Sequence, residues 1–266
     1  MPPHLLRSLT MDTLPCDFQT DSTTLADKTV LITGAASELG SSVAYGAAQS
    51  GATTIMVDRR EKDMAALYDE ICANRWPEPM LVEFDIRKAN YSDIDQLGIA
   101  LSQQFTQVDG VVHCANWGVP LTPIQHINIE TWENILANSL TKPMLITKAL
   151  IPLLEASGAG SIIFTALDTG RKGRAYWGGI ASAFAGIENL SEILSCELES
   201  MNIRTNTFDP GKVKTQFRKK CYPGETADQL RNANDPDIVR RYLYLLSEQS
   251  SHISGARFGI APLGAG

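Results

Sequence analysis

The feature that most constrains the fold is a strand-like run, a glycine-containing turn and a helix-like segment, in that order, early in the chain. Residues 28–33 (KTVLIT) are β-branched and apolar, and GAASELG and the helical pattern SSVAYGAAQSG follow them. The order predicts a strand, a tight turn and a helix. Further strands are predicted at residues 53–57, 80–86, 109–114, 161–165, 203–208 and 255–261. Strands alternating with helices of about ten or more residues favour a mostly parallel sheet covered on both faces. We therefore expect a single α/β domain with a doubly wound, seven-stranded sheet.

Two long helices are predicted in the second half of the chain, at residues 131–155 and 177–198. Pro143 and Pro152 mark kinks or breaks in the first, because proline cannot donate the helical hydrogen bond. A final helix is predicted at residues 236–247.

The segments outside this alternation are polar. Residues 1–26 are rich in Ser, Thr, Asp and Pro without a sustained period, which predicts a partly disordered surface arm ahead of a domain at residues 27–266. Residues 209–233 are expected to form a mobile loop.

Composition narrows the classes of partner and compartment. The net charge of -7 and the pI near 5.2 disfavour nucleic acid and anionic membranes as partners. No apolar run approaches the roughly 20 residues that span a bilayer. The five cysteines are scattered and the four histidines lack metal-ligand spacing, so we expect no disulfide framework and no metal site. The cytoplasm is the expected compartment, and small molecules and proteins are the expected partners.

The end of the second predicted strand carries charges suited to a nucleotide. Asp58 lies about twenty residues beyond the glycine turn, where a carboxylate accepts hydrogen bonds from the adenosine ribose of NAD. Arg59 could instead face the 2′-phosphate of NADP. Both cofactors remain open at this point.

From TGAASELG onward, the sequence resembles the short-chain dehydrogenase/reductase family. The resemblance covers residues 25–261 and rests on TG (33–34), Asp58, FDI (84–86), HCAN (113–116), Asn138 and DPGKVKT (209–215). GRKGRAYWG also resembles a branch of little-characterised bacterial reductases in which a similar phrase precedes the active-site tyrosine. The resemblance implies a single Rossmann-type domain with the cofactor, NAD or NADP, at the carboxyl ends of the strands. It also implies homodimers or homotetramers formed through the two long helices, although these helices could simply pack on the sheet.

The resemblance assigns a set of cofactor-binding positions. They are Gly34, Ser37, Leu39, Gly40, Asp58, Arg59, Asp85, Ile86, Ala115, Pro210, Gly211 and Thr215. Glu38 stands where the family pattern has a glycine that lets the backbone approach the dinucleotide. Its carboxylate could replace a phosphate at the helix start, where the dipole favours negative charge, or point into solvent.

The family's catalytic set is largely missing. The family uses a tyrosine as acid/base, a lysine one helical turn later, a serine that binds the substrate carbonyl and a supporting asparagine. Laid on the sequence without gaps, these positions are Ile180, Phe184, Leu167 and Asn138, so only the asparagine is kept. Leucine, isoleucine and phenylalanine carry no proton, hydrogen-bond donor or charge for the reaction. Tyr176 is the best displaced substitute, but it could simply pack the loop.

Three hypotheses for function follow from this pattern. The first is a non-catalytic or repurposed binding or regulatory scaffold, with a small-molecule ligand or a catalytic homologue as partner. The alternative is an NAD(P)-dependent oxidoreductase for a carbonyl or alcohol substrate that uses Tyr176 as its proton donor. The third is an apolar ligand pocket lined by the three replaced positions. Separately, the basic cluster of Arg171, Lys172 and Arg174 could hold an anion or be solvated.

Overall fold

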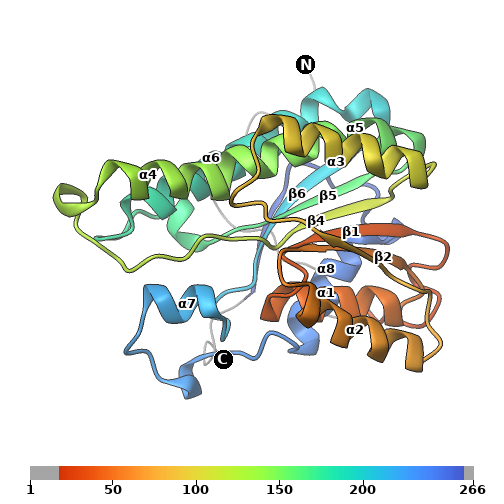
Figure 1. The fold of residues 1–266 in the computed structure, drawn as a ribbon, viewed down its shortest axis with the longest axis horizontal. Coiled ribbons are helices and arrows are strands. Elements are labelled where there is room, and N and C mark those ends of the chain that lie inside the picture. The colour runs from red at the N-terminus through yellow and green to blue at the C-terminus, as the bar shows by residue number, and fades with distance from the viewer. Residues whose placement is uncertain (1–17, 261–266) are drawn as a thin grey trace.

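The protein folds around one parallel sheet, seen in a computed structural model that describes residues 18–260 (Figure 1). Its strand order is β3-β2-β1-β4-β5-β6-β7, and every neighbouring pair is parallel. The strands are β1 (Thr29–Thr33), β2 (Thr53–Asp58), β3 (Met80–Glu83), β4 (Gly110–His113), β5 (Ser161–Thr165), β6 (Arg204–Asp209) and β7 (Arg257–Gly259). The predicted seven-stranded α/β fold is therefore confirmed.

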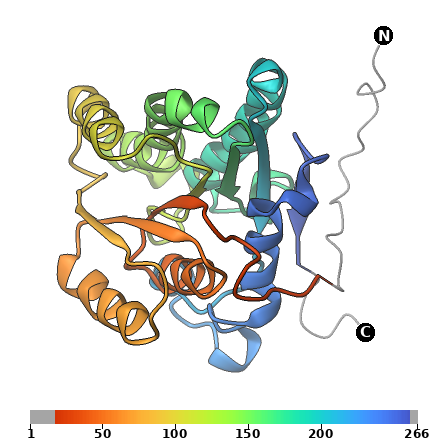
Figure 2. The ribbon, with the colours of Figure 1, turned by 90° about the vertical axis from the view of Figure 1, so that its right-hand side faces the viewer.

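Helices cover both faces of the sheet. They are α1 (Glu38–Gln49), α2 (Glu61–Ala73), α3 (Tyr91–Gln104), α4 (Ile129–Leu136), α5 (Lys142–Ala156), α6 (Gly178–Glu197), α7 (Gln216–Cys221) and α8 (Pro236–Leu246). Helices α3, α5 and α6 lie on one face, and α1, α2 and α8 lie on the other (Figures 1 and 2). No helix among residues 18–260 is long and apolar enough to cross a membrane.

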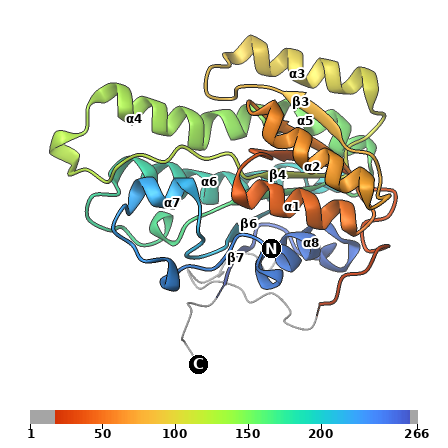
Figure 3. The same cartoon turned by 60° about the horizontal axis from the view of Figure 1, so that its bottom comes forward.

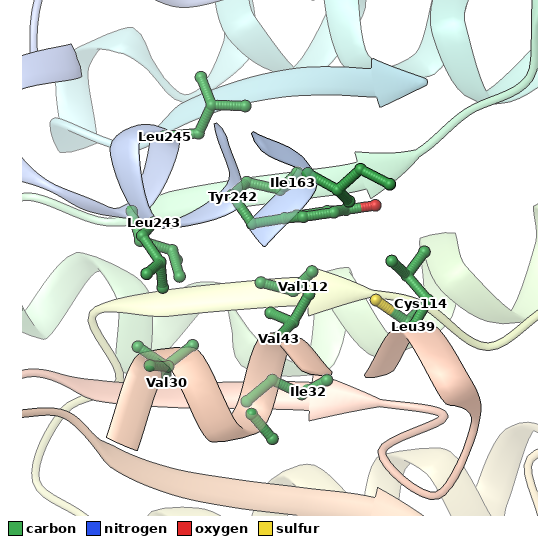
Figure 4. Close-up of a cluster of buried hydrophobic side chains, with 14 of the residues drawn as sticks. Val30, Ile32, Leu39, Val43, Val112, Cys114, Ile163, Tyr242, Leu243 and Leu245 are labelled. Carbon is green, nitrogen blue, oxygen red and sulfur yellow. The ribbon is translucent and has the colours of Figure 1, made fainter. Parts of the chain in front are cut away.

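Alternate side chains of each strand feed two separate cores. In β1, Val30 and Ile32 pack towards α1 and α8, whereas Leu31 packs towards α3, α5 and α6. Figure 4 shows the first core, where Val43 of α1 and Tyr242 of α8 meet strand residues. Burial on both faces explains why β1, β2, β4 and β5 are largely apolar runs. Strand β6 (RTNTFD) is buried as well, although most of its side chains are polar.

The helix predicted at residues 131–155 is interrupted directly before its first proline, Pro143, and not at its second, Pro152. A π-helical turn, η3 (Ala137–Thr141), separates α4 from α5. Pro143 lies in the first turn of α5, where the chain continues from the π-helical turn, and it has no N–H to donate to the carbonyl of Ser139 in that turn. Pro152 lies inside α5 without ending it. The irregular turn before Pro143 contains Asn138.

Two segments expected to be loose carry structure. The predicted mobile loop contains α7, whose N-cap Thr215 accepts a hydrogen bond from the backbone N–H of Arg218 at 3.2 Å. Helix α7 extends beyond the edge where the strands end, on the left of Figure 1 and again in Figure 3. Of the predicted arm, residues 1–17 lie outside the described residues. Phe18 and Leu25 are buried in the core, so residues 18–26 belong to the folded domain.

Candidate active site

A cavity of about 390 Å³ opens at the carboxyl ends of the strands. It lies where the sheet order reverses, between β1 and β4, because β1 continues to β2 on one side and β4 continues to β5 on the other. In open α/β sheets this switch point is where ligands bind. Residues that follow β1, β2, β3, β4, β5 and β6 all line it.

The turn between β1 and α1 forms one wall of the cavity. Gly34 has a φ of +69°, and Gly40 packs so closely that an added Cβ would lie 2.2 Å from the Gly34 carbonyl oxygen. Ser37 caps α1 by accepting a hydrogen bond from the Gly40 N–H at 3.1 Å. The wall is therefore a tight backbone turn leading into a helix start, which attracts anions.

Asp58 is bound to this turn. Its Oδ2 accepts a hydrogen bond from the Ala36 N–H at 3.2 Å, and its Oδ1 accepts one from the Arg60 N–H at 3.1 Å. The Arg60 side chain also contacts Asp58 at 3.5 Å and donates to the Ala36 carbonyl. Arg59, in contrast, is exposed, lines the cavity and has no hydrogen bond or ion pair among residues 18–260.

The segment after β3 supplies a second charged pair. Burial acts to raise the pKa of Asp85, but hydrogen bonds from Arg87 outweigh it, so the pKa lies below its usual value. The Arg87 guanidinium also lies over the ring of Trp117, 5.5 Å from its centroid. Asp85 is therefore ionised and already paired.

The structure brings the predicted cofactor positions together. All of them line the cavity except Gly40, which packs against the turn behind it: Gly34, Ser37, Leu39, Asp58, Arg59, Asp85, Ile86, Ala115, Pro210, Gly211 and Thr215. These residues lie at or after the carboxyl ends of five strands, β1, β2, β3, β4 and β6, and they meet at one edge of the sheet.

Asn138 and Leu167 also line the cavity. The Asn138 side chain lies in the π-helical turn, where its Nδ2 donates to the Asn134 carbonyl at 2.7 Å and its Oδ1 accepts from the Lys142 ammonium at 3.1 Å. Burial lowers the pKa of Lys142. The Asn138 amide is therefore engaged by its own helix.

Ile180 and Phe184 lie outside the cavity lining and are 2% and 1% exposed. They pack with Ile135, Trp177 and Cys221 in an apolar cluster between α4, α6 and α7. The third hypothesis, an apolar ligand pocket lined by all three replaced positions, is thus wrong, because two of the three side chains fill a core.

Tyr176 lies outside the cavity lining as well. It is 59% exposed, and its φ of +75° is uncommon for a residue with a side chain. Its carbonyl accepts a hydrogen bond from the Thr122 N–H at 3.3 Å, which fastens two loops together.

The basic cluster of the same loop divides into one buried arginine, Arg171, and two exposed residues, Lys172 and Arg174. The Arg171 guanidinium donates to Glu188, 2.6 Å away, and both side chains are buried. Arg174 pairs with Asp168. Burial raises the pKa of Glu188, and it raises the pKa of Asp209, 3.9 Å from Arg171, to about 6. None of Arg171, Lys172 and Arg174 lines the cavity.

Several cavity residues were not predicted from the sequence. Phe217, Arg218 and Lys220 all belong to α7, and Glu38 contacts Gln216, the first residue of that helix. A threonine cap followed by basic residues in the last helical turn was the available signal for α7.

The sheet order, the two helical layers and the cavity at the switch point define a doubly wound α/β protein of the Rossmann type. Residues 28–226 match the family model described as short chain dehydrogenase. The chain therefore belongs to the short-chain dehydrogenase/reductase family.

Relatives with names and structures support the same placement. The uncharacterised oxidoreductase YciK of Escherichia coli K12 is 29% identical over 245 residues, covering 92% of this chain and 96% of the relative. A solved structure of YciK has a TM-score of 0.86. A candidate short-chain dehydrogenase from Escherichia coli CFT073, solved with NADPH, has a TM-score of 0.86 and 28% identity, covering 91% of this chain and all of that one.

These matches bear directly on the sequence hypotheses. The family and its resemblance to little-characterised bacterial oxidoreductases are confirmed. The relatives are named oxidoreductases and dehydrogenases, which supports the oxidoreductase alternative more than a non-catalytic role. No cluster of three or more metal-ligating side chains occurs in the described part of the chain.

Proposed function

We propose that this protein binds NADP(H) in the cavity at the carboxyl ends of the strands. The observation that carries the proposal is the meeting of the glycine turn, the start of α1 and the ends of β2 and β3 around one cavity. A helix start favours phosphate, and the tight turn lets the backbone approach it. Related structures solved with NADPH and with NADP support the same ligand class.

The choice of NADP(H) over NAD(H) rests on how the charges are paired. Asp58 accepts hydrogen bonds from Ala36 and Arg60, which leaves less of its carboxylate for a ribose. The exposed Arg59 lines the cavity, and it makes no hydrogen bond or ion pair among the described residues beyond a longer-range attraction to Asp85. A guanidinium matches the geometry and charge of a phosphate, so Arg59 suits the 2′-phosphate that distinguishes NADP.

Titration of the full-length protein tests this proposal, with tryptophan emission as the signal because Trp117 lines the cavity. We expect NADPH to quench the emission in a saturable way and to bind at least about tenfold more tightly than NADH, the scale of one charge-assisted contact. Arg59→Ala should remove that difference, and Lys62→Ala, an exposed change on α2, should keep it. No saturable binding of either dinucleotide at about millimolar concentration would overturn the proposal.

We further propose that the bound dinucleotide is not turned over by the family's tyrosine and lysine, so that the protein acts as a binding or regulatory scaffold. This part rests on the resemblance that assigns Leu167, Ile180 and Phe184 to the catalytic positions. It is supported by the burial of Ile180 and Phe184 in a packed cluster, since such side chains cannot exchange protons with a substrate.

A second candidate function is favoured by the relatives' names: an NAD(P)-dependent oxidoreductase acting on a carbonyl or alcohol. Tyr176 is its proposed proton donor, and a loop movement would have to bring that exposed side chain to the cavity. NADPH oxidation with a panel of aldehydes and ketones separates the two functions. The scaffold predicts no carbonyl-dependent oxidation. The oxidoreductase predicts turnover that falls roughly 100-fold or more in Tyr176→Phe.

A further inference from the structure

Glu38 connects two parts of the molecule across the opening of the cavity. It is the first residue of α1, and its carbonyl accepts hydrogen bonds from Ser41 and Ser42 at 3.2 and 2.8 Å. Its carboxylate Oε1 accepts a hydrogen bond from the backbone N–H of Gln216, the first residue of α7, at 3.2 Å. A half-buried carboxylate therefore lies between the starts of α1 and α7, at the cavity wall.

The start of α1 is also where a ligand's phosphates would be held, because its N–H groups and dipole favour negative charge. Glu38 already places a negative charge there. A diphosphate entering the cavity would meet this carboxylate as a like charge. For unit charges about 4 Å apart, the repulsion weakens binding from about fivefold under water-like screening to roughly a thousandfold near a protein surface.

Helix α7 is fastened on its other side by aromatic contacts. Phe217 meets Phe184 edge to face, with ring centroids 6.5 Å apart. The Trp177 indole N–H donates to the Tyr222 hydroxyl at 3.1 Å. Glu38 therefore holds the start of a segment that is also fastened through its aromatic side chains to Phe184 of α6 and to Trp177, which precedes α6.

We propose that Glu38 sets the affinity of the cavity for diphosphate-bearing nucleotides and holds the start of α7 until such a ligand arrives. A bound diphosphate displaces the carboxylate from the start of α1 and frees the Gln216 N–H. The repulsion by Glu38 weakens the binding of ligands that carry a diphosphate, such as NADPH and ADP. It does not weaken the binding of adenosine, which carries no phosphate. This inference rests on the proposed binding of NADP(H).

Glu38→Gln is the informative variant, because glutamine keeps the length of the side chain and an oxygen that can accept from Gln216 while removing the charge. We expect calorimetric titration of the full chain to show NADPH binding about tenfold or more tighter in this variant and adenosine binding changed less than about twofold. Glu61→Gln is the matched control, since Glu61 is the first residue of α2 and lies outside the cavity lining. It should leave both affinities unchanged.

The outcomes separate this inference from the function on which it rests. If wild type binds NADPH and Glu38→Gln binds it equally well, the inference fails and the proposed function stands. A gain of equal size for NADPH and adenosine would also overturn it, because a change of shape, not of charge, would then explain the result. If neither protein binds NADPH at about millimolar concentration, the proposed function itself fails.

Amide exchange supplies an independent readout. NADPH should speed exchange of the Gln216 N–H in wild type, and an unchanged or slower rate would contradict the release of this N–H from Glu38.

Discussion

Charged side chains around the cavity separate into those paired within the protein and those left for a ligand. Asp58 and Asp85 each form an ion pair with a neighbouring arginine, whereas Arg59 forms no ion pair among residues 18–260 and only attracts Asp85 from a longer distance. Glu38 is half-buried and bonded to the chain at Gln216. We therefore expect Arg59 to attract a negatively charged ligand group and Glu38 to repel one.

Phe184, which stands where the family has a lysine, contributes to stability through packing. Its ring is 1% exposed and packs on Phe217. We expect Phe184→Ala to lower the free energy of unfolding by about 3–5 kcal/mol, the usual cost of deleting a buried phenyl ring. Urea denaturation measures this change. Ile129→Ala, at a side chain 70% exposed, should stay within about 0.5 kcal/mol and serves as the control. Equal stability of both variants would show that Phe184 is not packed as described.

The limits of sequence interpretation are also clearest at single residues. Gly34 and Asp58 could be placed because short spacing along the chain fixes them at adjacent strand ends. The partner of Glu38 could not be placed, because Gln216 is 178 positions away and the bond depends on a tertiary contact. Likewise, the run of basic residues gives no sign that Arg171 forms a buried ion pair with Glu188.

Among the elements, the loop between β5 and α6 is held by buried charge. Arg171 bonds Glu188 of α6 at 2.6 Å, and Arg257 of β7 contacts Glu188 at 3.5 Å. Asp209 at the end of β6 lies 3.9 Å from Arg171. A loop, a helix and two strands are thereby joined, so the GRKGRAYWG segment is anchored at its first arginine.

This anchoring can be tested by removing one partner. Arg171→Met should lower the free energy of unfolding by about 3–5 kcal/mol, because it leaves the Glu188 carboxylate buried without its closest cation. Arg174→Met removes an exposed pair with Asp168 in the same loop and should cost no more than about 1 kcal/mol. Thermal or denaturant unfolding compares the two. Similar losses in both variants would contradict a special role for the buried pair.

The same network predicts a dependence of stability on pH. Burial raises the pKa of Asp209 from 3.8 to about 6, so between these values the folded state binds the proton more strongly than the unfolded chain. Its contribution to stability is therefore complete below about pH 4 and is lost as the pH rises through 6, by at most about 3 kcal/mol. Asp209→Asn should reduce the fall in unfolding free energy between pH 4 and about pH 7. The exposed Asp69→Asn should not. An identical pH profile for Asp209→Asn and wild type would refute the assignment.

Over the whole molecule, alternating strands and helices were sufficient to predict the fold, because the central strands are buried on both faces and most helices between strands are long. Residues 209–233 were less predictable. The short helix α7 is stabilised by contacts with Glu38 and with the apolar cluster between α4, α6 and α7 more than by its own sequence pattern. Assembly into homodimers or homotetramers through α4, α5 and α6 stays a prediction, which light scattering against the 29.0 kDa chain mass checks.

Hydrogen exchange of the full-length protein with and without NADPH tests the central claim most directly, because it reports both binding and its place. We expect NADPH to slow amide exchange in the turn at residues 34–40 and in the segments after β2, β3 and β4, which meet at the cavity. Helix α3 (Tyr91–Gln104), which lies outside the cavity lining, should be unaffected. Unchanged exchange in all four segments at about millimolar NADPH, or protection confined to surfaces away from the cavity, would contradict the account.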